Sequence, residues 1–294
     1  MRKIKISVLT PVYNTPLPYL KEMMESVLSQ TYSDFEFIIL NDSPENIDLE
    51  KQVLSYNDPR IRYIRNDHNM GIAASRNKLL SLAQGEYVAI LDHDDVCLPQ
   101  RFEKEIHFLD NNPSYGVVSG NIVFFPEDPH TTNYPQDNQE IKLALLKGCY
   151  VVHTAAMLRK SVIDKNNIHY ESVYSPSEDY MLWIRLIGVT MFHNLPDILV
   201  KYRCYKTNTS HQQAAQMQDK TLLIQNVAYS TYPYLFQYIQ SYPQKRWIYL
   251  FGFLPFIKIV HINHSKSKYF LFGFILIGKA KRIMNTKFSL YNIY

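Results

Sequence analysis

The sequence lacks the glycine-rich patterns that hold phosphates in two common classes of nucleotide-binding protein. No G-x-G-x-x-G follows the first apolar segment, and no G-x-x-x-x-G-K-[ST] occurs anywhere in the 294 residues. The first pattern marks dinucleotide-binding sheets and the second marks P-loop NTPases. A dehydrogenase-type Rossmann domain is therefore disfavoured, and a nucleotide site in this chain must be built differently.

Cysteine and surplus charge are also scarce. The three cysteines, Cys97, Cys149 and Cys204, are odd in number and widely spaced, which fits neither a disulfide framework nor a C-x-x-C metal site. A reducing cytoplasm is the simplest setting for them. The net charge of +4 is too small to indicate nucleic-acid binding by itself.

No apolar run is long enough to cross a membrane. The N-terminal run over residues 6–12 is too short for a signal peptide and is expected to be the first strand. Near the C-terminus, residues 249–258 are echoed by residues 270–279, a short internal duplication. Each copy has about half the ~20 residues that a membrane-spanning helix needs, so we do not expect a transmembrane protein.

What the sequence does contain is a regular alternation of strand and helix patterns. Hydrophobic residues make up 46% of the chain and charged residues 20%, as in a globular protein. Strands are predicted at 4–9, 35–40, 61–65, 86–91, 115–125 and 150–158, and helices at 17–30, 47–56, 99–109 and 212–229, with another running through residue 83. The first four predicted strands end in polar residues. This alternation predicts a doubly wound, mainly parallel α/β sheet.

Two acidic segments stand out. Asp92-His93-Asp94-Asp95 follows the predicted strand 86–91, where open α/β sheets bind ligands, and its oxygens suit a divalent cation bound to a polyphosphate. Alternatively, these residues only form a turn or cap the next helix. Glu178 and Asp179 fall in the first turn of a helix that Ser175 or Ser177 can cap, and they too can serve only to stabilise that helix end.

The C-terminal part of the chain has a different character. We divide the chain into a domain over residues 1–210 and a helical, amphipathic extension over residues 211–294. Basic residues flank the duplicated apolar runs: Lys245, Arg246, Lys258, Lys266, Lys268, Lys279, Lys281 and Arg282. Aromatic and basic residues around short apolar runs favour the headgroup region of an anionic membrane. The alternative is a helical pair that covers the main domain or a dimer interface.

Taken together, several motifs resemble glycosyltransferase family 2, the inverting nucleotide-sugar transferases of GT-A fold. The matching motifs are Thr10-Pro11-Val12-Tyr13-Asn14, Asn41-Asp42, Asn69-Met70-Gly71 with Arg76-Asn77, Asp92-His93-Asp94-Asp95, and Glu178-Asp179-Tyr180 with Leu182-Trp183. They occur in the family's order and cover roughly residues 4 to 205. Each is weak alone, but the set is specific.

The resemblance implies roles for these residues. A Mn²⁺ or Mg²⁺ ion would neutralise the leaving diphosphate, with Asp94 as its ligand and Asp92 and His211 as further candidates. Donor binding would fall to Thr10, Pro11, Val12, Tyr13, Asn14, Asp42, Asn69, Gly71, Arg76, Asp92 and His93. Asp179 would be the general base, and His153, Glu178, Trp183 and Arg203 would bind acceptor or line the site. One departure is Tyr205, which stands where relatives often have a histidine; His211 is the nearby candidate to replace it.

The implied activity is a metal-dependent, inverting transfer of a hexosyl or N-acetylhexosaminyl group. The expected donor is a UDP-sugar, and the expected acceptor is a saccharide, free or lipid-linked, in surface polysaccharide, lipopolysaccharide or capsule synthesis at the cytoplasmic face of the inner membrane. Two alternatives remain open. A sugar-phosphate nucleotidyltransferase would need a glycine-rich, basic loop after the first strand, which residues 10–14 do not supply. A non-catalytic nucleotide-sugar-binding or assembly protein would lack a working base.

Overall fold

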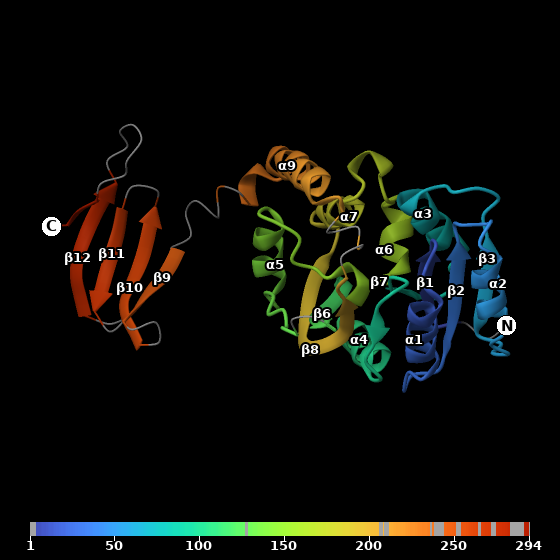
Figure 1. The fold of residues 1–294 in the computed structure, drawn as a ribbon. Coiled ribbons are helices and arrows are strands. Elements are labelled where there is room, and N and C mark those ends of the chain that lie inside the picture. The colour runs from blue at the N-terminus through green and yellow to red at the C-terminus, as the bar shows by residue number, and fades with distance from the viewer. Residues whose placement is uncertain are drawn as a thin grey trace. The chain divides into compact units, whose positions relative to one another are not determined.

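The computed structural model divides the chain into a compact unit that ends at Ala228 and a second unit that begins at Tyr229. It describes residues 4–126, 129–205, 208, 212–235, 237, 244–250, 254–263, 266–271, 275–282 and 291–293. Within the described part of the first unit, eight strands form one sheet in the order β3-β2-β1-β4-β7-β6-β8-β5 (Figure 1).

The N-terminal half of this sheet is parallel. Its strands are β1 (Ile6–Val12), β2 (Phe35–Asn41), β3 (Ile61–Arg65) and β4 (Tyr87–Ile90), joined by α1 (Leu17–Leu28), α2 (Ile47–Leu54) and α3 (Ile72–Leu82). β1 lies between β2 and β4, and β3 pairs with β2. Because these strands run in one direction, their C-terminal ends meet at the same edge, where the polar residues of the sequence gather. The predicted doubly wound arrangement is confirmed in this half.

The other half of the sheet is mixed. It contains β5 (Val96–Cys97), β6 (Tyr115–Phe125), β7 (Met157–Arg159) and β8 (Met191–Arg203), with helices α4 (Arg101–Asn111), α5 (Asn138–Leu145), α6 (Lys160–Lys165) and α7 (Glu178–Leu186) between them. β6 and β8 are parallel, whereas β7 runs antiparallel to both β4 and β6. The sheet as a whole is therefore mostly, not wholly, parallel.

The prediction of a strand over residues 150–158 is mostly wrong. Within this segment only the last two residues belong to a strand, β7 (Met157–Arg159), and His153–Ala155 form a turn of 3₁₀ helix, η1. The apolar character of the segment reflects burial in this turn, since His153, Thr154 and Ala155 are all buried. The loop after β6 runs back along this strand, because Phe124 donates its backbone N–H to the carbonyl of His130 and Thr132 donates its backbone N–H to the carbonyl of Ile122.

An arginine rather than an apolar side chain fills the space beneath the end of β4. Arg101, on α4, is fully buried and donates to the carbonyls of Ile90 (2.8 Å) and Thr154 (2.8 Å). Its Nε bonds Glu105 Oε2 at 3.1 Å, one turn along the same helix, and Glu105 is also fully buried. Arg101 thus ties the end of β4 to η1, the two segments that carry Asp92 and His153.

Helix α9 (Ala214–Thr231) covers the C-terminal side of the first unit, near α5 and α7 in Figure 1. It buries Ile224 and Ala228, and Gln225 donates to the carbonyl of Lys147 at 2.8 Å. Lys220 donates to the carbonyl of Val173 at 2.6 Å, in the turn η2 (Ser172–Tyr174) that precedes α7. The helix predicted over 212–229 is therefore present, and it packs on the first unit.

The expectation of a helical extension needs correction for the remainder of the chain. The described residues of the second unit form an antiparallel sheet in the order β13-β12-β11-β10-β9. Its strands are β9 (Gln244–Leu250), β10 (Leu254–Asn263), β11 (Lys266–Leu271), β12 (Ile275–Arg282) and β13 (Tyr291–Ile293). Aromatic or β-branched residues occur in each of these segments, and such residues favour strands over helices.

The sequence duplication corresponds to a structural repeat of strand pairs. The first copy spans the end of β9 and the start of β10, where Leu250 pairs with Leu254. The second copy spans the end of β11 and the start of β12, where Leu271 pairs with Ile275. Among the helices that the structure describes, none combines the length and apolarity that a bilayer crossing requires.

The Arg101–Glu105 pair makes a prediction about stability. Arg101→Met leaves Glu105 buried without its cation and leaves several carbonyls without a donor, so it should lower the free energy of unfolding by about 3–5 kcal/mol. Adding Glu105→Leu should recover part of this loss. Urea unfolding monitored by circular dichroism measures both.

The control is an exposed pair with the same spacing. Lys160 and Asp164 lie 2.7 Å apart on α6, and Asp164 is exposed, so Lys160→Met should cost no more than about 1 kcal/mol. Equal losses for Arg101→Met and Lys160→Met would contradict the structural role given to Arg101.

Candidate active site

The segment after β1 combines a buried part with an exposed part. β1 continues through Val12, beyond the predicted end of the strand at residue 9. Thr10, Pro11 and Val12 are therefore buried strand residues, whereas a polar loop was expected there. Beyond them, Tyr13 is 51% exposed, and Asn14 has a positive φ of 46° and donates its N–H to Ser43 Oγ at 3.1 Å. Tyr13 is thus the residue of this segment that can offer an aromatic face to a ligand.

Asp42, directly after β2, organises the next loop. Its Oδ1 accepts hydrogen bonds from Asn66 Nδ2 (2.7 Å) and the N–H of Met70 (2.8 Å), and its Oδ2 accepts from the N–H of Gly71 (2.9 Å). Gly71 has a φ of 81°, a conformation that glycine adopts without strain. Asn69 Oδ1 accepts a second bond from the same N–H at 2.8 Å. Asp42 therefore fixes the shape of the loop that leads into α3.

Arg76, on the second turn of α3, joins the two acidic segments. Its Nη2 bonds Asp92 Oδ1 at 2.8 Å, and its Nη1 bonds Glu178 Oε1 at 2.6 Å. Burial opposes its charge, but Asp92 and Glu178 outweigh that effect and raise the pKa of Arg76. Asp92 and Glu178, which are 86 positions apart in the sequence, are thereby bound to the two Nη atoms of one guanidinium.

The same arginine keeps Asp92 ionised. Burial raises the pKa of Asp92, but Arg76 more than offsets this, and the net pKa is lowered. The backbone N–H of Asp92 donates to Thr154 Oγ1 at 3.1 Å, which ties the loop to η1. Asp92 is thus a fixed, negatively charged side chain at the C-terminal end of β4.

Asp179 has the properties of a proton acceptor near neutral pH. Burial and the neighbouring Glu178 raise its pKa to about 6, while Arg76 acts in the opposite direction. Its Oδ1 accepts the N–H of Tyr180 at 2.7 Å. Ser177 stands at the N-cap of α7, as predicted, but its side chain makes no capping hydrogen bond. A carboxylate with a pKa of about 6 is largely ionised at pH 7 yet takes up a proton readily.

His153 and Trp183 lie behind this group and are buried. His153 Nε2 is 2.9 Å from the hydroxyl of Tyr170, and its ring centroid is 5.9 Å from that of Trp183. Burial together with Arg76 lowers the pKa of His153 to about 3, so its imidazole is neutral. Tyr170 also faces Arg76, whose Cζ lies 5.6 Å from the ring centroid. These side chains support Arg76 rather than forming an open surface.

Asp94 and Asp95 are held by Arg203, the last residue of β8. Arg203 Nε donates to the carbonyl of Asp94 and the N–H of Arg203 donates to Asp95 Oδ1, both at 2.8 Å. The guanidinium of Arg203 pairs with Glu22 and stacks on Tyr19, 4.1 Å from the ring centroid. Arg203 therefore braces the acidic loop through its backbone and does not point its charge at the Asp94 carboxylate.

The carboxylates of the acidic loop suit a cation. Burial raises the pKa of Asp95 well above its ordinary value, and the neighbouring Asp94 and Asp92 act in the same direction. The described residues contain no group of three His, Cys, Asp or Glu side chains placed to hold a metal. His211 lies outside the described residues.

Three contributors to the site were missed at the sequence level. Tyr170 contacts Arg76 and His153, Thr154 binds the backbone of Asp92, and Tyr205 donates its hydroxyl to Asp94 Oδ2 at 2.8 Å. The departure at Tyr205 was the available signal, since the family resemblance leads one to expect a histidine at that position. Tyr170 and Thr154 lie in segments with no distinguishing pattern.

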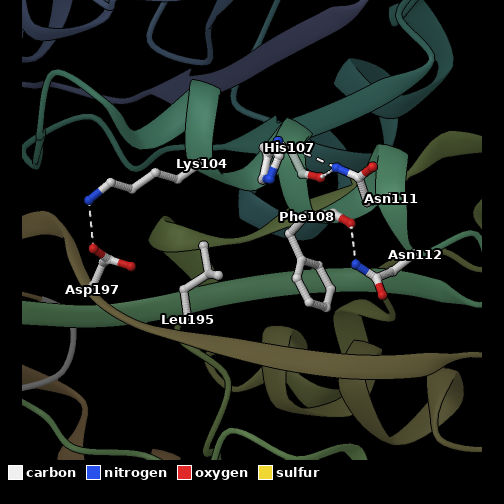
Figure 2. Close-up of a pocket in the computed structure, with 7 residues that line it drawn as sticks. All are labelled: Lys104, His107, Phe108, Asn111, Asn112, Leu195 and Asp197. Atoms are coloured by element: carbon white, nitrogen blue, oxygen red, sulfur yellow. Dashed lines mark hydrogen bonds and ion pairs between the residues drawn. The ribbon is translucent and has the colours of Figure 1, made fainter.

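A hollow of about 490 Å³ lies elsewhere, between α4 and β8 (Figure 2). It is lined by Lys104, His107, Phe108, Asn111, Asn112, Leu195 and Asp197. Lys104 and Asp197 form an ion pair of 2.6 Å across one end of it. None of the predicted site residues borders this hollow, so it does not belong to the site described above.

Comparison with known sequences identifies the family to which this chain is similar. The family model described as "Glycosyl transferase family 2" matches residues 7–166. An uncharacterized glycosyltransferase of Methanocaldococcus jannaschii is 36% identical over 210 residues, which is 69% of this chain and 72% of the relative. The amylovoran biosynthesis glycosyltransferase AmsE of Erwinia amylovora is 29% identical over 203 residues, covering 67% of this chain and 75% of the relative.

Comparison with solved structures supports the same fold. S. aureus TarS 1-349 in complex with UDP-GlcNAc matches with a TM-score of 0.59 and 20% identity over 75% of this chain. The chain spans 65% of the length of that protein. Mannosyltransferase PcManGT from Pyrobaculum calidifontis, in complex with GDP-Man and Mn²⁺, matches with a TM-score of 0.60 and 15% identity, covering 80% of this chain and 70% of the neighbour.

The geometry predicts that Glu178 controls the proton affinity of Asp179. Glu178→Gln removes a neighbouring negative charge that raises the pKa of Asp179, and the pKa should therefore fall from about 6 toward the ordinary aspartate value. A pH titration of the carboxyl ¹³C resonances, with Asp179 assigned by its loss in Asp179→Asn, measures the shift.

Glu171→Gln is the matched control, because Glu171 pairs with Arg185 at 2.8 Å on the outer side of α7. It should leave the Asp179 titration unchanged. An Asp179 pKa that stays near 6 or rises in Glu178→Gln would show that burial alone sets it.

Proposed function

The chain belongs to glycosyltransferase family 2, and we propose that it transfers a sugar, with inversion, from a UDP-sugar to a saccharide acceptor in a metal-dependent reaction. The observation that carries the proposal is the double contact of Arg76 with Asp92 and Glu178. It brings the acidic loop after β4 and the acidic start of α7 to one site, as a reaction with a departing diphosphate and an incoming hydroxyl requires.

On this proposal, Asp179 is the general base. An acceptor hydroxyl that attacks the anomeric carbon loses its proton, and a carboxylate with a pKa of about 6 can take that proton at neutral pH. Glu178 is engaged through Oε1 with Arg76, so its part is to hold Arg76 and to raise the pKa of Asp179. The sugar bond to the diphosphate breaks on the opposite face, which gives inversion.

The donor lies along the C-terminal ends of β1, β2 and β4. Tyr13 is placed to contact the base, and Asp42, Asn69 and Gly71 shape the loop beside it. Asp92, with its charge fixed by Arg76, faces the ribose. The UDP-GlcNAc complex of TarS, which shares the fold, supports a uridine nucleotide.

A Mn²⁺ or Mg²⁺ ion would be held by Asp94, with Asp92 and His93 beside it. When bound, such an ion neutralises the charge that develops on the diphosphate. The Mn²⁺ complex of the PcManGT neighbour supports this cofactor. The clustering of Asp92, Asp94 and Asp95 on one short loop supports it from within this chain; burial, together with the two neighbouring carboxylates, raises the pKa of Asp95.

We further propose that the second unit holds the enzyme on the cytoplasmic face of the inner membrane, beside a lipid-linked acceptor. The register of β11 and β12 places Lys266 opposite Lys281 and Lys268 opposite Lys279. Clusters of lysine and arginine beside short apolar segments favour binding to anionic headgroups. The relative named for amylovoran biosynthesis supports a role in building a saccharide polymer.

Asp179→Asn tests the base. The asparagine side chain has nearly the same size but cannot take the proton, so turnover should fall by about two or more orders of magnitude with donor binding unchanged. In the unaltered enzyme, activity should decline as pH falls through about 6, where Asp179 becomes protonated. Release of UDP from UDP-sugars in the presence of an acceptor is measured from about pH 5 to about pH 8. It gives both the turnover of Asp179→Asn and the pH dependence of the unaltered enzyme.

An unchanged turnover in Asp179→Asn would remove the proposed base. Binding of UDP with no sugar transfer to any acceptor and no donor hydrolysis would instead favour a non-catalytic nucleotide-sugar-binding protein. Formation of a nucleotide-sugar from a sugar phosphate and UTP would identify a nucleotidyltransferase.

Removing positive charges from the second unit tests the membrane proposal. Replacing Lys266, Lys268, Lys279 and Lys281 with glutamine in the full chain should weaken flotation with phosphatidylglycerol vesicles by about tenfold or more, at about 1 kcal/mol per lysine near the surface. Replacing the exposed Lys21, Lys51, Lys147 and Lys165 instead should leave flotation unchanged. Equal flotation of all three proteins, or equal binding to neutral phosphatidylcholine vesicles, would reject the proposal.

A further inference from the structure

Tyr205 makes a direct contact with the carboxylate to which the proposed function assigns the metal. Its hydroxyl donates to Asp94 Oδ2 at 2.8 Å, and Asp94 itself is 8% exposed. Two residues earlier, Arg203 holds the Asp94 carbonyl and the Asp95 carboxylate. The last residue of β8 therefore binds the backbone of Asp94, and Tyr205, two residues further on, binds its side chain.

The position of Tyr205 is itself fixed. Its backbone N–H donates to Asn208 Oδ1 at 2.6 Å, and Asn208 Nδ2 donates back to the carbonyl of Arg203 at 2.9 Å. Its ring lies against Tyr19 of α1, with centroids 5.5 Å apart. A hydroxyl that is held by both a turn and a packed ring can set the direction of the carboxylate it binds.

A carboxylate oxygen has two lone pairs, so Asp94 Oδ2 can accept the Tyr205 hydroxyl and still face a cation. Donors that bond to a ligating carboxylate orient it, and their loss typically lowers metal affinity by about 10- to 100-fold. The alternative is competition, in which Tyr205 occupies the oxygen that a cation needs. The two mechanisms predict opposite changes in affinity when the hydroxyl is removed.

We propose that Tyr205 is a positioning residue that orients the Asp94 carboxylate for the divalent cation. The proposal rests on the proposed function, since that function makes Asp94 the metal ligand. Tyr205 touches neither donor nor acceptor in this role, and acts through Asp94.

The experiment is a Mn²⁺ titration of the full chain at saturating UDP, followed by the electron paramagnetic resonance signal of free Mn²⁺. Tyr205→Phe keeps the ring and removes the hydroxyl, and it should weaken Mn²⁺ binding by about 10- to 100-fold. Tyr19→Phe, which removes a phenolic hydroxyl from the adjoining ring, should bind Mn²⁺ as the unaltered chain does. UDP binding in EDTA and the thermal midpoint of Tyr205→Phe should both be unchanged.

Asp94→Ala distinguishes a failure of the inference about Tyr205 from a failure of the proposed metal site on which it rests. If Asp94→Ala keeps normal Mn²⁺ binding, the proposed metal site fails, and the role of Tyr205 fails with it. If Asp94→Ala loses binding while Tyr205→Phe binds as tightly as the unaltered chain, only the inference about Tyr205 is overturned. Tighter binding by Tyr205→Phe would overturn it in favour of competition.

Discussion

The whole site depends on one buried cation between two carboxylates. Arg76 reaches the partly exposed Asp92 with one nitrogen and the buried Glu178 with the other, and burying the Glu178 carboxylate without it would be costly. The contact also sets the charge of its neighbours, since Arg76 lowers the pKa of Asp92 and, with burial, that of His153. A single guanidinium therefore determines both where the acids stand and which of them are ionised.

A second buried arginine supports this arrangement from below. Arg101 bonds the carbonyls of Ile90 and Thr154, which end β4 and form part of η1. These backbone groups would otherwise be buried without donors, a costly condition. Arg76 thus joins the acidic segments across the top of the sheet, while Arg101 fixes the strand end from which Asp92 projects.

Much of the fold could be predicted because its signals are local. The β2, β3 and β6 segments follow the predicted runs within a residue, since period and β-branched content show in any short window. The 150–158 segment was mispredicted because burial in a turn and burial in a strand give the same apolar run. The prediction of helices in the C-terminal part is wrong because aromatic runs flanked by lysines fit both an amphipathic helix and an amphipathic strand. Only the pairing between strands distinguishes the two.

The sequence by itself determined the family, the parallel half of the sheet and the two acidic segments, because each is written in contiguous residues. The tertiary structure decided which residues meet. Arg101 and Glu105 have the spacing of an ordinary surface ion pair on a helix, yet both are fully buried. Arg76 meets Glu178 across 102 positions, and Tyr205 meets Asp94 across 111. Such contacts depend on how the sheet brings distant segments together, which no local pattern encodes.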